Sequence, residues 1–318
     1  MTASDLSGPP AGALPFHTLD VFTRSAYAGN PLAVVLGAAA LSARQMQTIA
    51  REFNLSETIF VLPPEDPAHT ARVRIFFPTA EIPFAGHPTI GCAILLATQA
   101  HGPGDFTADL VLEEEAGLVP VQVTRRGAVT EAEFTAPVLP RAAAGRVDPD
   151  LIAAALDLPR AAIGFGMHSP AVWEGGPSFL YVPVAGLDDL ARARPIEPHW
   201  SAMTEAAGVD SAYLYTPGPD CDFRARMFSP GAGIPEDPAT GSASAILAAQ
   251  LRAARALAPG TQVFALRQGV EMGRPSEITL SIDHGPAGIT AIRIRGAAVP
   301  VSSGQIIPPA DPGVTPRG

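Results

Sequence analysis

Hydrophobic and polar positions alternate near the start of the chain and then recur at helical spacing. Residues 16–22 alternate, which predicts a strand, and residues 32–36 form a short apolar run typical of a buried strand. From Ser42, a suitable N-cap, to Phe53 the apolar residues fall on one helical face, and a strand over 59–62 follows. Along the chain, strand–helix crossovers alternate with hairpin-like segments, which predicts a mixed sheet in each half and thus an α+β fold.

One segment of the sequence occurs twice. Residues 72–97 and 224–249 match at 11 of 26 positions when they are aligned without a gap at a constant offset of 152. Each copy contains a short strand, a Pro-rich turn and an Ala-rich helix, predicted over 89–100 and 241–253. Because the offset is near half of the 318 residues, it indicates two similar domains rather than a solenoid, whose repeats are far shorter.

The second half of the chain retraces the first. We expect a first domain over residues 16–138, with 298–310 packing back on it, and a second over 139–297, joined near 137–147. Residues 1–15 and 311–318 are expected to be disordered tails. The remaining predicted elements are strands within 109–134 broken at Gly117 and Gly127, helices at 148–156 and 198–207, and strands at 179–182, 212–215, 278–282 and 291–296.

Composition narrows the class of protein. A hydrophobic content of 47% with a mean hydropathy of +0.20 fits a compact globular protein. No apolar run reaches the roughly 18 residues that span a bilayer, and the first residues have neither the basic nor the apolar part of a secretory signal. We therefore expect a cytoplasmic protein without membrane contact. A net charge of −10 without a basic patch argues against a nucleic-acid partner.

The sequence lacks the residues that several classes of cofactor require. All 21 basic residues are arginine, so pyridoxal-phosphate chemistry, Schiff-base catalysis and a Walker-type phosphate loop are excluded. The two cysteines, Cys92 and Cys221, form no CxxC, the seven histidines are scattered, and no GxGxxG follows a strand. We expect an enzyme, if it is one, that uses neither metal nor cofactor.

The two copies of the repeat differ most at the turn before the helix. Residues 84–88 read FAGHP in the first copy, whereas residues 236–242 read EDPATGS in the second. The scaffold is repeated and the polar chemistry is not. This pattern suggests one asymmetric site between two pseudo-equivalent halves.

Three side chains, two of them in these turns, are candidates for a catalytic role. Glu57 stands at a helix-to-strand junction between apolar residues, where desolvation can raise the pKa of a carboxyl and make it a general base; the alternative is a capping or surface acid. His87, between a Gly and a Pro, could donate to an anion or relay a proton, or could be structural. Asp237 precedes Pro238, and Asp-Pro is also a common turn sequence.

The starts of the two repeated helices are candidate anion sites. Gly241 and Ser242 open the second helix, and Gly86, His87 and Thr89 offer the same arrangement at the first. A helix N-terminus presents free N–H groups that can hold an oxyanion or a carboxylate. Two opposed helix N-termini with one carboxylate base would suit a carboxylate-bearing substrate that passes through an enolate-like state.

Five segments of the chain read DVFTRSAYAGNPLAVVL, IAREFNLSETIFVLP, FPTAEIPFAGHPTIGCA, FSPGAGIPEDPATGSA and QGVEMGRPS. In combination they resemble the phenazine-biosynthesis PhzF-like family, and the resemblance runs from about Phe16 to Ile307. It implies the diaminopimelate-epimerase-like fold, which has two pseudo-symmetric domains, each a mixed β-sheet or barrel wrapped around a central helix, with a cleft between them. It also implies a homodimeric, cofactor-independent isomerase of a small carboxylic acid, trans-2,3-dihydro-3-hydroxyanthranilate.

The resemblance also implies roles for individual residues. Glu57 of NLSET would be the acid/base that moves the proton. Backbone N–H groups after Gly86 and Gly241 would hold the substrate carboxylate or a ring oxygen. The implied catalytic set is Glu57, His87, Asp237 and Ser242, and the implied substrate-binding set is Gly86, Gly241 and Thr240.

Two other functions stay open on the sequence alone. Related epimerases and racemases use two opposed cysteines, but the corresponding turns hold Ala85 and Asp237, so a two-thiol racemase is excluded. Cys92 lies inside the first repeated helix and is expected to pack as a small apolar residue. An epimerase or isomerase of another small carboxylic or amino acid is possible. A non-catalytic binding protein is disfavoured because binding alone needs no acid/base.

Overall fold

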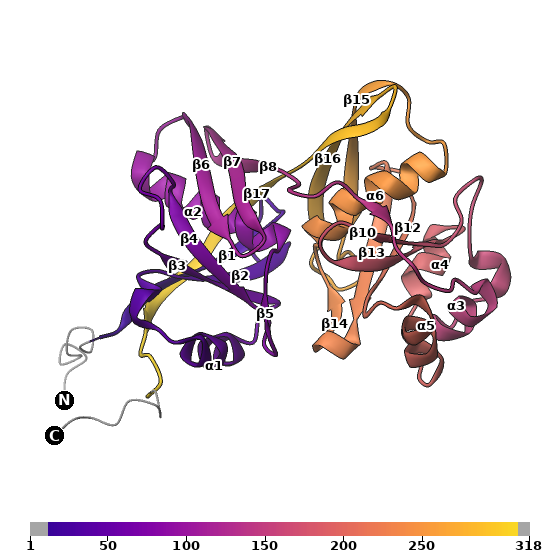
Figure 1. Ribbon diagram of the computed structural model, residues 1–318, viewed down its shortest axis with the longest axis horizontal. Coiled ribbons are helices and arrows are strands. Elements are labelled where there is room, and N and C mark those ends of the chain that lie inside the picture. The colour runs from indigo at the N-terminus through magenta and orange to yellow at the C-terminus, as the bar shows by residue number, and fades with distance from the viewer. Residues whose placement is uncertain (1–11, 311–318) are drawn as a thin grey trace.

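The structure, a computed structural model, describes residues 12–310. It is a two-domain α+β fold in which each half encloses one helix, α2 (Gly86–His101) in the first half and α6 (Gly241–Ala253) in the second (Figure 1). The greater part of the two tails expected to be disordered, residues 1–11 and 311–318, lies outside the described residues. Within the described part, no helix is long and apolar enough to cross a membrane.

The first half consists mainly of strands, and the second adds three small helices on its outer side (Figure 1). Besides α2, the elements of the first half are β1 (Leu14–Val21), β2 (Asn30–Val35), η2 (Ala38–Ala40), α1 (Ala43–Phe53), β3 (Glu57–Leu62), β4 (Ala71–Phe76), β5 (Glu81–Ile82), β6 (Phe106–Glu114), β7 (Gly117–Arg126) and β8 (Val129–Thr135). Besides α6, the later elements are β9 (Arg141–Ala142), α3 (Pro149–Ala155), η3 (Arg160–Ala162), β10 (Ala171–Glu174), β11 (Ser178–Pro183), α4 (Leu187–Arg192), α5 (His199–Ala207), β12 (Ala212–Pro217), β13 (Phe223–Ser229), η4 (Pro230–Ala232), β14 (Ile234–Asp237), β15 (Gly260–Gln268), β16 (Ser276–Gly285) and β17 (Gly288–Ile306).

Eight strands of the first half close into a barrel around α2. The hydrogen-bonded order is β1, β2, β3, β4, β6, β7, β8 and β17, and β17 returns to β1. The strands β2 and β3, and β4 and β6, run parallel, whereas the other neighbours are antiparallel. Eleven of the 16 residues of α2 are buried, from Gly86 to Ala97. A helix that is buried on all sides can bring a polar first turn into the protein interior.

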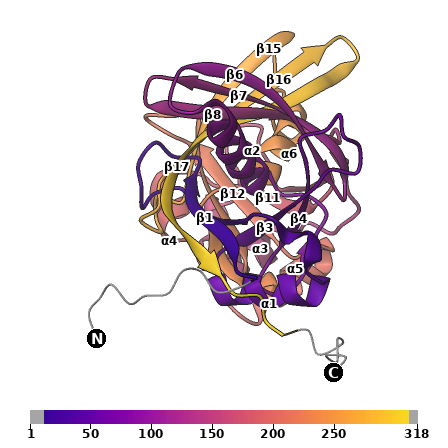
Figure 2. The same cartoon turned by 90° about the vertical axis from the view of Figure 1, so that its left-hand side faces the viewer.

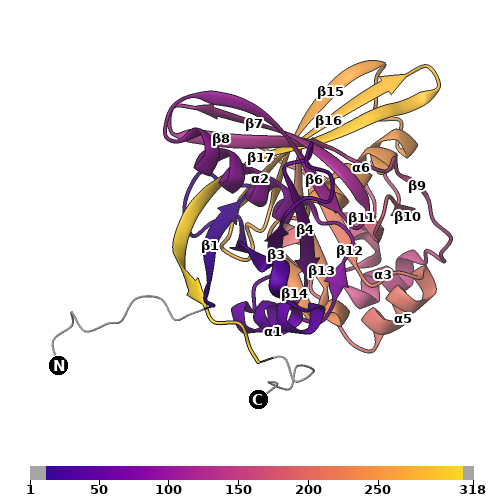
Figure 3. The ribbon, with the colours of Figure 1, turned by 60° about the vertical axis from the view of Figure 1, so that its left-hand side comes forward.

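The first half is completed by a segment from the far end of the chain. In the second half β10, β11, β12, β13, β15, β16 and β17 follow one another, and the short β9, which comes after β8, pairs with β10. After its pairing with β16, the strand β17 continues along β1, with Ala298 opposite Val21 and Ile306 opposite Leu14 (Figure 3). The two halves are therefore joined by continuous hydrogen-bonded strands.

Two predicted boundaries were wrong. The strand β1 begins at Leu14, inside the segment predicted to be disordered, because Leu14 pairs with Ile306 at the far end of the chain. The helix α2 begins at Gly86 rather than near Thr89. Pro88 lies in its first turn, where an N–H group would have no partner in the helix, so the proline is tolerated. The predicted N-cap Ser42 is confirmed and forms a capping box with Gln45.

The ungapped alignment of the repeat conceals a shift of three residues. The two helices begin 155 residues apart, at Gly86 and Gly241, but end 152 apart. In β4 and β5 Ile75 lies opposite Ile82, whereas in β13 and β14 Met227 lies opposite Asp237. The second turn is thus longer and its helix shorter. Consequently the structural counterpart of the N-cap Ala85 is the N-cap Thr240, not Asp237 as the sequence suggested; neither position holds a thiol.

The N-termini of α2 and α6 contact each other, and both helices lie near the middle of the molecule in the view along its long axis (Figure 2). A Cβ atom on Gly86 would lie 2.9 Å from the Cα atom of Gly241, and one on Gly241 would lie 3.1 Å from the Cα atom of Gly86. The ring of Phe22 packs beside this contact, 3.3 Å from the same Gly241 position. Only glycine allows the two helix starts to approach this closely.

Candidate active site

A cleft of about 560 Å³ opens at the junction of the two halves. Apolar side chains form most of its walls, among them Phe84 and Val138 from the first half and Phe179 and Met227 from the second. Its lining, within the described residues, contains no arginine or histidine. The polar side chains that line it are those of Glu57, Ser178, Asp210, Ser211, Ser229, Asp237, Thr240 and Ser242.

Glu57 is the first residue of β3. Its side chain lines the cleft although the residue is only 6% exposed. Burial raises the pKa of its carboxyl well above the ordinary value of 4.5, and the nearby charge of Asp237 raises it further. The Oε2 atom of Glu57 is buried and has no hydrogen-bond partner among the described residues. A desolvated carboxyl that is not held by donors binds a proton strongly, which is the property that a base for a carbon acid needs.

His87 is held behind Glu57 rather than in the cleft. Its Nε2 atom lies 3.3 Å from Glu57 Oε2, and its side chain is 3% exposed. The two atoms are close, but their geometry does not meet the criteria for a hydrogen bond. Burial lowers the pKa of His87 to about 3, and the imidazole is therefore neutral at physiological pH. His87 can act on a substrate only through Glu57.

Asp237, in contrast to Glu57, is surrounded by donors. Asn30 Nδ2 donates to its Oδ1 atom at 2.8 Å, and Thr240 Oγ1 donates to its Oδ2 atom at 2.6 Å. Gln268 Nε2 donates to the Asp237 carbonyl at 2.8 Å. Burial raises the pKa of Asp237 to about 6, although the bonds from Thr240 and Asn30 oppose the increase. When the two carboxyls share one proton, the donors favour the charge on Asp237 and leave the proton on Glu57.

The two helix N-termini supply the donors of the site. Ala85 and Thr240, the N-caps of α2 and α6, both line the cleft, as does Ser242 in the first turn of α6. The side chain of neither N-cap residue accepts a hydrogen bond from the N–H groups of the first turn, so these groups are free for a ligand. Both helix dipoles favour negative charge at the point where Gly86 contacts Gly241. The arrangement provides a binding position for a carboxylate or an oxyanion beside the Glu57 carboxyl.

All seven residues singled out from the sequence lie in or directly around this cleft. Glu57, Asp237, Thr240 and Ser242 line it, Gly86 and Gly241 form the contact between the helices, and His87 lies behind Glu57. Sequence reasoning missed Asn30 and Gln268. Both are fully buried amides that bind Asp237 from distant strands, and no local pattern identified them. The AGNP turn before β2 was the nearest available signal for Asn30.

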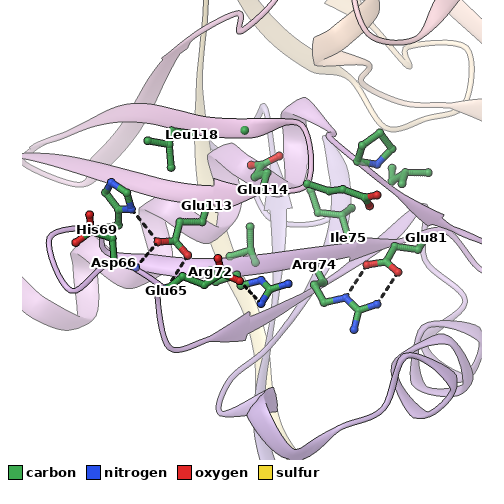
Figure 4. A pocket seen from close by; sticks show the side chains of 15 residues that line it. Glu65, Asp66, His69, Arg72, Arg74, Ile75, Glu81, Glu113, Glu114 and Leu118 are labelled. Atoms are coloured by element: carbon green, nitrogen blue, oxygen red, sulfur yellow. Dashed lines mark hydrogen bonds and ion pairs between the residues drawn. The ribbon is translucent and has the colours of Figure 1, made fainter.

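A larger cavity of about 740 Å³ lies on the first half, between β4 and the β6–β7 hairpin (Figure 4). Ion pairs involve all three of its bases and half of its six acids. Arg74 binds Glu81 through two bonds of 2.6 Å, Arg72 pairs with Glu65, and His69 with Glu113. Because its three bases and three of its six acids are paired with one another, this cavity differs from the cleft in its chemistry.

The two cysteines take no part in the site. Cys92 is fully buried inside α2, where burial raises the pKa of its thiol, and it packs as an apolar residue as expected. Cys221 lies in the turn before β13, away from the cleft lining. Over residues 12–310 no group of three His, Cys, Asp or Glu side chains could hold a metal ion.

The fold and the cleft define the class of protein as the two-domain, diaminopimelate-epimerase-like proteins. A PhzF-family phenazine biosynthesis protein from Bacillus anthracis superposes with a TM-score of 0.81 over 92% of this chain and 99% of its own, at 24% identity. Residues 19–304 match the family PhzC-PhzF, phenazine biosynthesis-like protein, and the chain belongs to this family.

Two relatives are similar over most of their length. An uncharacterized isomerase of Mesorhizobium japonicum is 43% identical over 90% of this chain and 96% of its own. A trans-2,3-dihydro-3-hydroxyanthranilate isomerase of Pseudomonas chlororaphis is 36% identical over 91% of this chain and 98% of its own. The predicted family is therefore confirmed.

Proposed function

We propose that the protein is an isomerase that moves a proton between two carbon atoms of a small cyclic carboxylic acid, with Glu57 as the acid/base. The observation that carries the proposal is one desolvated carboxyl that faces the point where two helix N-termini meet. Relatives 34–36% identical to the chain are named trans-2,3-dihydro-3-hydroxyanthranilate isomerase. We propose this compound, or a close analogue, as the substrate.

The substrate carboxylate would be bound by backbone N–H groups. The described lining of the cleft offers no arginine or histidine for an ion pair. The free N–H groups at the start of α2 and α6, together with the Ser242 hydroxyl, would be the donors, because the Thr240 hydroxyl already donates its hydrogen to Asp237. Apolar residues such as Phe84, Phe179 and Met227 would enclose the ring and exclude water.

In the reaction, the Glu57 carboxylate would remove a proton from one ring carbon. The electron pair would delocalise toward the substrate carboxylate, where the N–H groups of both helices stabilise the added negative charge. The protonated Glu57 would then return the proton to a different carbon, which restores the enzyme. Asp237 would remain ionised and hold its neighbours in place. No metal or coenzyme is needed for these steps.

Glu57→Gln tests the proposal. The amide keeps the size of the side chain but cannot take a proton, so turnover of trans-2,3-dihydro-3-hydroxyanthranilate should fall at least about 10⁴-fold, the top of the range for a general base. In D₂O, the wild-type product should carry deuterium wherever the transferred proton exchanges before delivery. A chelator should leave the rate unchanged.

Glu197→Gln, a substitution of an exposed glutamate at the start of α5, is the matched control and should retain full activity. Retention of more than about a tenth of the wild-type rate by Glu57→Gln would rule out the proton-transfer role. Wild-type protein that is inactive on this compound but catalyses Glu57-dependent deuterium exchange into another carboxylic acid would overturn the proposed substrate and keep the chemistry. The homodimer remains a prediction, which light scattering would check.

A further inference from the structure

Asn30 connects the two halves of the site. It is the first residue of β2 and is fully buried. Its side-chain nitrogen Nδ2 lies 3.2 Å from His87 Nδ1, 2.8 Å from Asp237 Oδ1 and 2.9 Å from the Ala239 carbonyl oxygen. One amide group therefore contacts both the histidine behind Glu57 and the carboxylate of the opposite half.

These neighbours determine the orientation of the Asn30 amide. The Asp237 carboxylate and the Ala239 carbonyl can only accept, so the amide nitrogen, not its oxygen, must face them. The nitrogen carries only two hydrogens for these two acceptors and His87 Nδ1, so the three contacts share them. A proton on His87 Nδ1 would point at the amide hydrogens of Asn30, so Nδ1 is the unprotonated ring nitrogen. In a neutral imidazole the proton is consequently on Nε2, the atom 3.3 Å from Glu57 Oε2.

We propose that Asn30 is a positioning residue that holds His87 in its neutral Nε2–H tautomer. This inference rests on the proposed function and adds to it. With Nε2 protonated, His87 can donate toward Glu57 but cannot accept a proton from it. The proton on Glu57 then has no route into the interior through His87, which favours its return to carbon. Burial of His87, which disfavours the imidazolium, acts in the same direction.

The turn that carries Asn30 is itself held by the second half. Arg274 Nη2 donates to Asp20 Oδ1 at 2.5 Å and to the Ala28 carbonyl at 3.0 Å, while its Nε atom donates to the Gly29 carbonyl at 2.8 Å. The Gly29 N–H group donates to the Pro275 carbonyl at 3.1 Å. The Asp20 carboxylate of this ion pair is buried, whereas the Arg274 side chain is 28% exposed. Asn30 is thus placed by contacts that form only when both halves are assembled.

The tautomer can be measured directly in protein without substrate. In ¹⁵N-histidine-labelled protein, two-bond ¹⁵N–¹H correlations distinguish a protonated from an unprotonated ring nitrogen, and the spectrum of His87→Gln assigns the His87 signals. We expect Nε2 to be protonated and Nδ1 unprotonated from pH 5 to pH 8. A protonated Nδ1, or an imidazolium in that range, would overturn the inference whether or not any variant folds.

Substitution of Asn30 provides the second readout. Asn30→Leu, similar in size, removes the donor, and Asn30→Asp replaces it with an acceptor that favours a proton on Nδ1. Both should change the His87 spectrum and lower kcat by about 10–100-fold, the range for groups that orient a functional residue, with KM changed less than about threefold. Wild-type kcat in a folded Asn30→Leu variant would contradict the proposal.

The control is Gln250→Leu. Gln250 is also a buried amide, and it binds Trp173, Ser169 and Tyr215 along α6. Its loss should lower the melting temperature but change neither the His87 spectrum nor kcat.

Different results would refute the proposed function and the role of Asn30. An active Glu57→Gln variant would refute the proposed function irrespective of the tautomer, whereas a wrong tautomer with an inactive Glu57→Gln variant would refute only the role of Asn30.

Discussion

At the scale of single residues, the site depends on the different surroundings of two carboxyls. Glu57 and Asp237 are both almost fully buried, but only Asp237 receives hydrogen bonds from Asn30 and Thr240. Pairs of acids whose surroundings separate their pKa values commonly divide the roles of charge holder and proton carrier. Here Asp237 would keep the charge and Glu57 would carry the proton.

The activity should therefore depend on pH through Glu57. The base must be ionised, so kcat/KM should rise with pH through the raised pKa of Glu57, with an acid limb well above pH 4.5. Asp237→Asn removes a negative charge that opposes this ionisation, so the pKa of Glu57 should fall and the limb should move to lower pH. A pH profile of both proteins measures the shift. An unchanged limb, or one moved to higher pH, would contradict the assignment.

At the scale of the elements, the close approach of α2 and α6 is required for the shared binding position. Gly86→Ala would place a Cβ atom 2.9 Å from the Gly241 Cα atom, so the helices must separate. Overpacking of this kind costs about 1–3 kcal/mol, and because both sets of N–H groups move, we expect activity to fall more than about 100-fold. Gly104→Ala, where the added methyl group meets open space, should change neither property.

The repeated arginine of β4 and β13 should differ in importance between the halves. Arg226 makes two 2.8 Å bonds to Glu236, donates to the carbonyls of Leu190, Ala191 and Ala193 at the end of α4, and is 7% exposed. Arg226→Ala leaves Glu236, whose side chain is 14% exposed, and three carbonyls without this partner, which should cost about 3–5 kcal/mol.

Its counterpart Arg74 pairs with Glu81, and its side chain is 24% exposed, so Arg74→Ala should cost less than half as much. Urea denaturation of the two variants gives both free energies of unfolding. Equal losses would show that the contacts with α4 add nothing.

At the scale of the whole molecule, the halves are not independent units, because β17 pairs with β16 of the second half and with β8 and β1 of the first. We expect a single unfolding transition in urea. Both tryptophans, Trp173 and Trp200, lie in the second half, so their fluorescence reports on that half, whereas far-UV circular dichroism reports on both. The two midpoints should coincide. A first half that unfolds separately would show that β17 does not couple them.

The repeat was sufficient to predict two similar domains and the two buried helices, whereas the family was indicated by five segments, three of which lie outside the repeat. Helix periodicity, the Ser42 cap and strand alternation depend on residues that are close in the sequence, so they could be recognised from the sequence alone. The candidate residues were also found, because the turns before α2 and α6 differ in their polar residues between otherwise similar copies.

What only the tertiary structure decided depends on contacts between distant residues. The sequence could not indicate that Leu14 pairs with Ile306, that β17 closes the first barrel, or that the second turn is three residues longer while its helix is shorter. Nor could it place Asn30 against both His87 and Asp237, 57 and 207 residues away. Burial and hydrogen bonding set the proton affinities of Glu57, His87 and Asp237, and both properties arise only when the two halves come together.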